Sequence, residues 1–288
     1  MSHCARLFQL EHSNTRTLEH MKDKVVIITG GSSGIGKACA LAFGKHGARV
    51  VISGRNQERL DEAIKTLEAA SIECMGVVSD VASESDSKEL IKQTVAKYGQ
   101  LDILINNAGI SMRSLFDDCD PSVIKKVMDI NFYGTVYATK YALPYIKQFK
   151  GSIVGVSSIA GYRGLPARTG YSASKFAMQG FLEALRTELL KDDVHVLVAC
   201  PGFTESNIRN TALVADGNTQ GESPRDEGKM MKAEEVAQYI FNAVKRKKRS
   251  LVLTTQGKMT VLLNKLLPAF MDKMVYKHMA KEKDSPLK

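Results

Sequence analysis

Short apolar runs alternate with longer segments of helical periodicity along the chain from Lys22 onward. The apolar runs are rich in β-branched residues and alternate little with polar ones, which is typical of strands buried on both faces of a sheet. Helices between such strands form the crossovers of a parallel sheet. We therefore predict an α/β fold, a single doubly wound (Rossmann) domain whose seven-stranded parallel sheet is flanked by helices. The predicted strands are residues 25–28, 49–52, 72–78, 101–105, 152–156, 195–199 and 250–253, and the predicted helices are about 34–47, 56–70, 83–98, 121–148, 170–191 and 233–246.

The chain divides into three segments. Residues 1–20 lack the apolar region of a signal peptide and precede a second methionine, Met21, so we expect a flexible N-terminal extension. Residues 21–255 hold the predicted sheet and its helices, and residues 256–288 form a C-terminal tail.

The C-terminal tail has the pattern of a basic amphipathic helix. From Met259 to Met279, large apolar residues recur at helical spacing, lysines lie among the polar positions, and Pro268 predicts a kink. One interpretation is a peripheral membrane anchor, with the basic run 245–249 against anionic lipid. The other is a helix that packs on the same domain or on another subunit of a homo-oligomer.

Charge and cysteine content narrow the class of protein. The net charge is +9, but residues 245–288 hold twelve Lys or Arg against three Asp or Glu, whereas the rest of the chain holds 28 of each. A nucleic-acid enzyme would carry basic residues around its cleft, so we expect no nucleic-acid partner. The five cysteines show no paired spacing, which argues against a disulfide framework and a metal site. We expect a cytoplasmic protein, peripheral on a membrane if the tail is an anchor.

A glycine-rich loop follows the first predicted strand and leads directly into a helix. It reads Thr-Gly-Gly-Ser-Ser-Gly-Ile-Gly over residues 29–36 and includes Ile35. Gly30 permits a tight turn, Gly34 lets backbone approach a pyrophosphate, and Gly36 allows close helix packing. The helix N-terminus that follows supplies amides for phosphate groups. This context predicts a dinucleotide site.

The end of the second predicted strand indicates which dinucleotide binds. An NAD-dependent enzyme usually has an acidic residue here, for the ribose 2′-hydroxyl, but this chain has Gly54 and Arg55. The guanidinium of Arg55 can bind a 2′-phosphate bidentately, and Ser32 and Ser33 can donate hydroxyl groups. We predict NADP(H) as the cofactor.

Three further strand ends carry residues suited to this site. Asp80 can accept from the adenine amino group, with Val81 against the ring. Small residues after the fourth strand suit contact with the nicotinamide half of the cofactor: Asn107, Ala108 and Gly109. We expect Asn106 to bond locally and assign no role to Ser157, but Ser158 ends the fifth strand and is a candidate donor.

Tyr171 and Lys175 stand four residues apart in a predicted helix, so their side chains share one face. A nearby ammonium favours the ionised form of a phenol, which makes the tyrosine a better proton donor at neutral pH. A loop over residues 159–169 can bring Ser158 beside the phenol. These residues predict general acid/base chemistry on one oxygen atom.

In this order, the motifs resemble those of the short-chain dehydrogenase/reductase family over about residues 22–255. The resemblance implies that residues 21–255 are a catalytic domain that transfers hydride from NADPH to a ketone, or the reverse. It implies that Tyr171 and Lys175 also contact the cofactor and that Asn131, in a helix, anchors a proton-relaying water. The implied catalytic residues are Asn131, Ser158, Tyr171 and Lys175, and the implied stretch over the nicotinamide includes Pro201, Gly202 and Thr204.

The identity of the substrate is the property that the sequence determines least. Residues 205–232 are polar and aperiodic, so we expect a mobile segment beside the site, where Met230 and Met231 line a pocket or pack on the next helix. The C-terminal tail and two motifs, Gly-Gly-Ser-Ser-Gly-Ile-Gly-Lys and Tyr-Ser-Ala-Ser-Lys-Phe-Ala, are similar to those of the family branch that reduces lipid-like ketones. This branch includes 3-ketosphinganine reductases and 11β-hydroxysteroid dehydrogenases. We expect a long-chain 3-keto compound or a steroid. The alternatives are a small soluble carbonyl substrate, a non-catalytic NADP-binding sensor and a lipid-binding scaffold.

Overall fold

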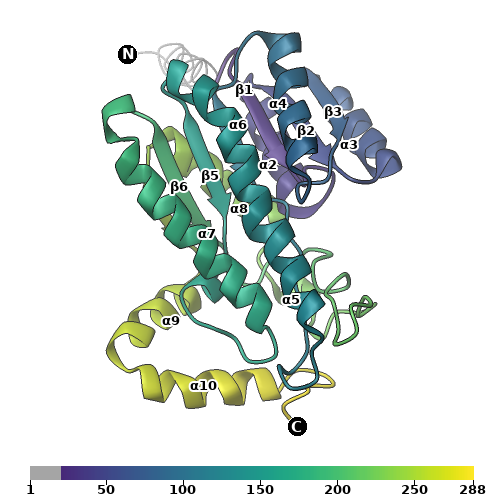
Figure 1. Ribbon diagram of the computed structural model, residues 1–288, viewed down its shortest axis with the longest axis vertical. Helices are drawn as coiled ribbons and strands as arrows, with labels where there is room; N and C mark the ends of the chain where they lie inside the picture. Colours follow the sequence, from purple (N-terminus) through teal and green to yellow (C-terminus); the bar gives the residue numbers. More distant parts are fainter. Residues whose placement is uncertain (1–20) are drawn as a thin grey trace, which may run out of the picture.

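The strands form one parallel sheet in the computed structural model, which describes residues 21–288 (Figure 1). The sheet is seven-stranded, with the order β3-β2-β1-β4-β5-β6-β7. The predicted α/β architecture is thereby confirmed; residues 1–20, predicted to be a flexible extension, lie outside the described part. The strands are β1 (Val25–Thr29), β2 (Arg49–Gly54), β3 (Cys74–Val78), β4 (Ile103–Asn106), β5 (Ser152–Val156), β6 (His195–Cys200) and β7 (Ser250–Val252).

The strand order reverses at β1, which pairs with β2 on one side and with β4 on the other. In doubly wound sheets, the loops at the carboxyl ends of two such strands turn away from each other and leave a crevice between them. The loops that follow β1 and β4 therefore flank the crevice where a ligand is expected.

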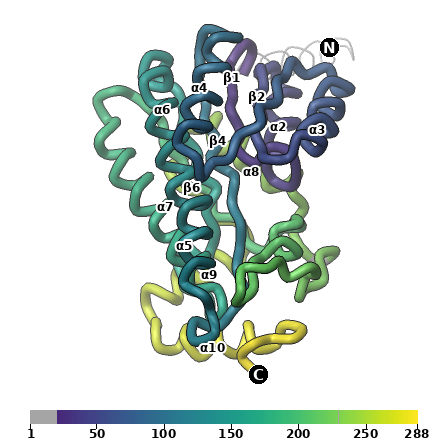
Figure 2. Tube along the Cα trace, turned by 45° about the vertical axis from the view of Figure 1, so that its right-hand side comes forward, coloured from purple at the N-terminus to yellow at the C-terminus, as the bar shows by residue number. Residues whose placement is uncertain are grey.

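Helices cover both faces of the sheet (Figure 2). One face packs on α2 (Gly34–Gly44), α3 (Gln57–Ala69) and α8 (Ala233–Lys245), and the other on α4 (Glu84–Tyr98), α6 (Gly134–Gln148) and α7 (Thr169–Glu188). Successive residues of β1 point to opposite cores: Val26 and Ile28 to the first, Val25 and Ile27 to the second. Both cores are apolar, which explains why the central strands read as continuous hydrophobic runs.

The predicted helix at 121–148 is wrong in one respect, because a π-helical turn interrupts it. The structure has α5 (Pro121–Met128), a π turn at Asp129–Tyr133 and then α6. A π turn adds one residue without disturbing the apolar pattern on either side, so the periodicity alone could not reveal it. The strand predicted at 72–78 also starts later, at Cys74, and its edge position leaves it half exposed rather than buried on both faces.

The tail forms two helices rather than one kinked helix. These are α9 (Thr255–Leu266) and α10 (Pro268–Ala280), which meet at Leu267, whose φ and ψ of −136° and 60° are not helical. Pro268 is the first residue of α10, where its fixed φ is favourable. Figure 1 shows both helices beyond the carboxyl ends of β5 and β6. Apolar residues of α10 pack in a small cluster with Leu165: Met271, Val275 and Met279.

Within residues 21–288, none of the helices combines the length and the apolar character needed to cross a membrane.

Candidate active site

A cavity of about 1290 Å³ lies at the carboxyl ends of the strands. Its wall combines the glycine-rich loop, the ends of β2 to β6, the segment after β6 and the tail. Gly36 and Asn131 do not line it. The predicted site residues that do are Gly30, Ser32, Ser33, Gly34, Ile35, Arg55, Asp80, Val81, Asn107, Ala108, Gly109, Ser158, Tyr171, Lys175, Pro201, Gly202 and Thr204.

The glycine-rich loop is tightly packed because its glycines sit where a side chain would collide with neighbouring backbone. Gly30 has a φ of +64°, and a Cβ there would come within 2.9 Å of the Ala108 Cα. A Cβ on Gly36 would lie 2.2 Å from the carbonyl oxygen of Gly30. Ser33, at the N-terminus of α2, makes no side-chain capping bond, so the first amides of this helix are open to an anion. These residues fit a dinucleotide pyrophosphate.

Two arginines line the cavity at the end of β2. Arg55 follows the strand, and Arg59 comes from the first turn of α3. The Asn56 side chain accepts a hydrogen bond of 2.8 Å from the Arg59 amide and so caps this helix. Arg59 is not among the predicted site residues, although its spacing of four from Arg55 was a usable signal.

Asp80 and Val81 follow β3 as expected, but the Asp80 carboxylate is partly engaged. It accepts a hydrogen bond of 3.0 Å from the Ala82 amide, which shapes the turn into α4. Val81 is buried against Gly134, where a Cβ would come within 2.9 Å of the valine. Both Asp80 and Val81 line the cavity, where the sequence predicts the adenine ring.

Asn107 fixes the glycine-rich loop to the end of β4. Its amide nitrogen donates to the carbonyl oxygens of Thr29 at 3.0 Å and Gly30 at 3.1 Å. Asn106 donates to the Thr139 hydroxyl of α6 at 3.1 Å inside the core, a side-chain bond to a residue 33 positions away rather than the local bond expected for it. Asn107 thus shapes the cavity mainly by holding the backbone of the glycine-rich loop in place.

Lys175 is buried one turn after Tyr171 on α7. Its ammonium lies 5.8 Å from the centre of the Tyr171 ring and donates a 3.0 Å hydrogen bond to the carbonyl oxygen of Val156. Burial disfavours its charged form and lowers the pKa of Lys175 to about 8.

The protein alone does not lower the pKa of Tyr171, contrary to the sequence-based expectation for its pairing with Lys175. Burial raises this pKa above its ordinary value, while a hydrogen bond with Ser158 and the positive charges of Arg168 and Arg209 act in the opposite direction. Burial wins because the phenolate would lose its hydration. Both arginines line the cavity, and sequence analysis had not singled them out.

Asn131 lies in the π turn and is completely buried. Its amide oxygen accepts from the Ile110 amide at 2.8 Å, and its nitrogen donates to the Ile110 carbonyl and to the Ser174 hydroxyl, both at 2.9 Å. The absence of a side chain at Gly109 leaves space here, since a Cβ would lie 3.1 Å from Asn131 and 3.5 Å from Lys175. The Asn131 side chain thus holds the loop after β4 against α7.

The segment after β6 closes one side of the cavity. Thr204 is buried, and its hydroxyl donates to the Gly202 carbonyl at 3.2 Å. Arg209 forms an ion pair with Glu227, which ties together the two ends of the stretch predicted to be mobile. Met230 and Met231 line the cavity, and Met231 also packs against the core beneath α8, so this methionine fits both expectations.

The tail also contributes to the wall, which agrees with the alternative that it packs on the same domain. Residues Met271, Met274, Val275, His278, Met279 and Glu282 all line the cavity. Glu282 accepts from Arg168 at 2.9 Å and from Arg225 at 2.7 Å. A usable signal was that Glu282 is one of three acidic residues in a strongly basic stretch.

Comparison with known proteins identifies the family. The family model for short chain dehydrogenase matches residues 24–215, so the chain belongs to the short-chain dehydrogenase/reductase family of oxidoreductases. Rat dehydrogenase/reductase SDR family member 7B is 36% identical over 293 residues, covering 98% of this chain and 90% of the relative. Arabidopsis thaliana 11-beta-hydroxysteroid dehydrogenase 1A is 34% identical over 272 residues, covering 88% and 75%.

Solved structures show the same fold. A short chain dehydrogenase/reductase from Burkholderia phymatum in complex with NAD matches with a TM-score of 0.78 and 23% identity, over 87% of this chain and 96% of that one. An alcohol dehydrogenase from Thermococcus sibiricus, complexed with 5-hydroxy-NADP, matches with a TM-score of 0.70 and 22% identity, over 80% and 95%. Members of the fold thus hold either type of nicotinamide dinucleotide.

Proposed function

We propose that the protein is an NADP(H)-dependent oxidoreductase that interconverts a ketone and a secondary alcohol. One observation carries the proposal: Ser158, Tyr171 and Lys175 line one cavity, between a glycine-rich loop with two arginines and a wall of apolar tail residues. A cofactor in the first part and a carbonyl compound in the second would meet at the tyrosine.

The residues divide the chemistry between them. A bound nicotinamide supplies or accepts the hydride. In the reducing direction, the Tyr171 hydroxyl gives its proton to the developing alkoxide, and Ser158 donates a hydrogen bond to the same oxygen. Lys175 helps to hold the cofactor ribose beside Tyr171. Asn131 keeps the loop after β4 in place through Ile110, which steadies the cavity opposite α7.

The preference for NADP(H) is supported by the charge at the end of β2. Arg55 and Arg59 both line the cavity there, and neither is paired with a carboxylate among the described residues. Two guanidinium groups favour a 2′-phosphate, whereas a ribose 2′-hydroxyl needs an acceptor.

A lipid-like substrate, such as a long-chain 3-keto compound or a steroid, is supported by the apolar tail side of the cavity. Leu165, Met271 and Val275 pack there, and unbranched methionine side chains adapt to irregular apolar ligands. The relatives from Arabidopsis thaliana named as 11-beta-hydroxysteroid dehydrogenases agree with this class. A small soluble carbonyl compound is the alternative, and its weak point is this apolar wall, which a small polar substrate would not need.

The decisive experiment is a substrate panel with NADPH and NADH, in which cofactor oxidation is followed by absorbance. Long-chain 3-keto compounds, steroids and small diketones are compared. We expect turnover with NADPH and higher kcat/KM for the large apolar ketones. Turnover of the small diketones alone would favour the alternative substrate class, and NADPH binding without turnover of any member would favour a sensor.

The tail also supports peripheral membrane contact by an otherwise cytoplasmic protein. Four large apolar side chains around the junction of α9 and α10 are at least half exposed: Leu262, Leu266, Leu267 and Phe270. The lysines at 258, 265, 273 and 277 are exposed on the same two helices. Apolar residues flanked by lysines suit an anionic membrane surface. Burial of this surface in a homo-oligomer is the alternative.

A further inference from the structure

The carboxylate of Glu282 is buried among three arginines. The residue is only 5% exposed, although it lies in the tail beyond α10. Its oxygens lie 2.9 Å from Arg168, 2.7 Å from Arg225 and 3.7 Å from Arg113. Burial alone would raise the pKa of Glu282, but Arg168 and Arg225 outweigh this effect and hold the pKa below its ordinary value. The carboxylate is therefore the charged partner of a buried cationic cluster.

The three arginines come from three different loops around the cavity. Arg113 belongs to the loop after β4, and Arg168 precedes α7, three residues before Tyr171. Arg225 belongs to the segment after β6, and its guanidinium lies 3.8 Å from the centre of the Phe203 ring. Glu282 thus joins these loops at one point of the cavity wall.

The cluster is incomplete without the tail. Burial lowers the pKa of both Arg113 and Arg225, and the other arginines lower each pKa further. Removing the carboxylate from such a cluster leaves buried like charges that repel one another. The three loops would then separate or admit water, so their arrangement depends on Glu282.

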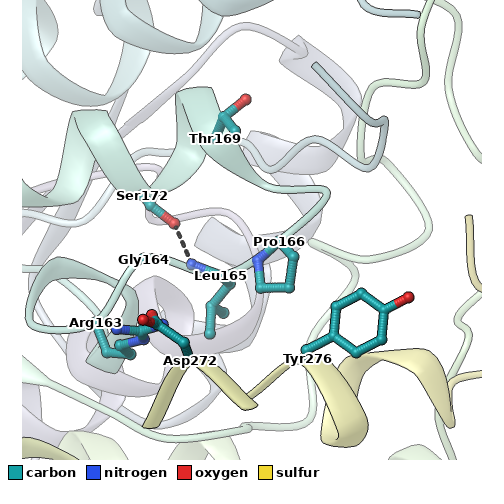
Figure 3. Close-up of a pocket in the computed structure, with 8 residues that line it drawn as sticks. All are labelled: Arg163, Gly164, Leu165, Pro166, Thr169, Ser172, Asp272 and Tyr276. Carbon is teal, nitrogen blue, oxygen red and sulfur yellow. Dashed lines mark hydrogen bonds and ion pairs between the residues drawn. The ribbon is translucent and has the colours of Figure 1, made fainter. Parts of the chain in front are cut away.

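A second set of contacts holds α10 on the loop of residues 163–169, which leads to Arg168 and α7. Figure 3 shows Asp272 of α10 pointing toward Arg163, and Tyr276 beside Pro166, around a hollow of about 450 Å³. The Ser172 hydroxyl accepts a hydrogen bond of 3.1 Å from the Leu165 amide, which fixes this loop to the start of α7. Contacts of α10 with residues 163–169 are therefore passed to the helix that carries Tyr171.

We propose that Glu282 is a positioning residue of the reaction: it docks the tail, closes the substrate side of the cavity and fixes Arg168 beside Tyr171. This inference rests on the proposed function, because it assigns α10 as the wall that contacts a large apolar substrate. The glycine-rich loop and Arg55, proposed to hold the phosphates and the adenosine half of the cofactor, make no hydrogen bond or ion pair with the tail among the described residues. The cluster approaches the cofactor site at Phe203, between Gly202 and Thr204, where Arg225 packs on the ring.

The test compares Glu282→Gln and Glu282→Asp with the control Glu222→Gln. Glu222 pairs with Lys283, the neighbour of Glu282, but both side chains of that pair are exposed. For Glu282→Gln we expect the KM for the best large ketone to rise about tenfold, with the dissociation constant of NADPH unchanged. Glu282→Asp keeps the charge on a shorter side chain and should lie between this variant and the wild type. Glu222→Gln should match the wild type.

Hydrogen exchange of the α10 amides is measured on the same proteins. Faster exchange in Glu282→Gln than in Glu222→Gln supports docking by Glu282, and equal exchange with equal KM values overturns the proposal. If the dissociation constant of NADPH rises by the same factor as the KM for the ketone, the proposal is also overturned, because that pattern indicates general misfolding. If the wild type reduces no ketone, the proposed function fails, while the exchange comparison still decides the docking role.

Discussion

The ammonium of Lys175 donates a hydrogen bond to the carbonyl oxygen of Val156, the last residue of β5. This bond joins the helix that carries Tyr171 to the sheet, and it places a cation in a buried position. Burial of this cation makes the stability of the cofactor-free protein depend on pH.

Replacement of Lys175 by methionine should stabilise the cofactor-free protein near pH 7 while abolishing turnover. The pKa of Lys175 is about 8 in the fold against an ordinary value of 10.5, so the buried charge costs up to about 3 kcal/mol below pH 8. Between pH 8 and 10.5 the unfolded chain binds more protons, so wild-type stability rises with pH. Urea unfolding at several pH values should show the advantage of Lys175→Met shrinking across this window. A difference in the free energy of unfolding that stays constant across this pH range would contradict a lowered pKa for Lys175.

Replacement of Tyr171 by phenylalanine should remove the proton donor and lower kcat by about a thousandfold or more. NADPH binding should change little, because the ring remains in place. Fluorescence titration with NADPH and turnover assays separate the two effects. Tyr98→Phe is the control, since the Tyr98 hydroxyl is buried, has no hydrogen-bond partner within residues 21–288 and does not line the cavity. Substantial activity in Tyr171→Phe would refute the proposed acid.

Replacement of Arg55 by aspartate should shift the cofactor preference toward NADH. The carboxylate would repel a 2′-phosphate and accept from a 2′-hydroxyl, so the ratio of kcat/KM for NADPH over NADH should fall by a factor of about 100. Lys65→Asp makes the same charge change on α3 at an exposed residue outside the cavity and should leave the ratio unchanged. If both variants shift the ratio equally, the effect is one of general charge rather than of this site.

Acid should weaken the docking of the tail. The pKa of Glu282 is lowered in the fold from an ordinary value of 4.5, so its contribution to stability is present above pH 4.5 and is lost as the pH falls through the lower folded value. Melting temperatures of the wild type and Glu282→Gln should therefore converge below pH 4.5. A gap that stays constant to lower pH would mean that the carboxylate does not stabilise the fold by its charge.

Glutamate substitutions at Leu266 and Phe270 should reduce sedimentation with vesicles that contain phosphatidylserine. Both side chains are more than half exposed, so the fold should tolerate the change. Leu190→Glu is the control, because Leu190 is an exposed leucine between α7 and β6, far from the tail in sequence. If the wild type does not sediment and the substitutions instead lower its mass in light scattering, the surface is an oligomer contact.

The central sheet could be predicted because strands such as β1 and β5 are buried on both faces and, apart from Thr29 and Ser152 at their ends, consist of apolar residues and glycine. The cavity residues at strand ends could be predicted for a related reason, since the topology brings these ends together. Arg168 and Glu282 could not, because their contact joins residues 114 positions apart. Nor does the local sequence distinguish Asn107, which bonds to the backbone of the glycine-rich loop, from a side chain that faces the ligand.

The π turn at Asp129–Tyr133 has a consequence for insertions and deletions. Each residue of a helix turns the chain by about 100°. Loss of one residue from this turn would therefore rotate α6 relative to α5 and carry Gly134 away from Val81, where no side chain fits. Exchange of an exposed residue within the turn keeps the number of residues between the two helices, whereas a single codon removed from its gene would break either the contact of α5 with α7 or that of α6 with α4.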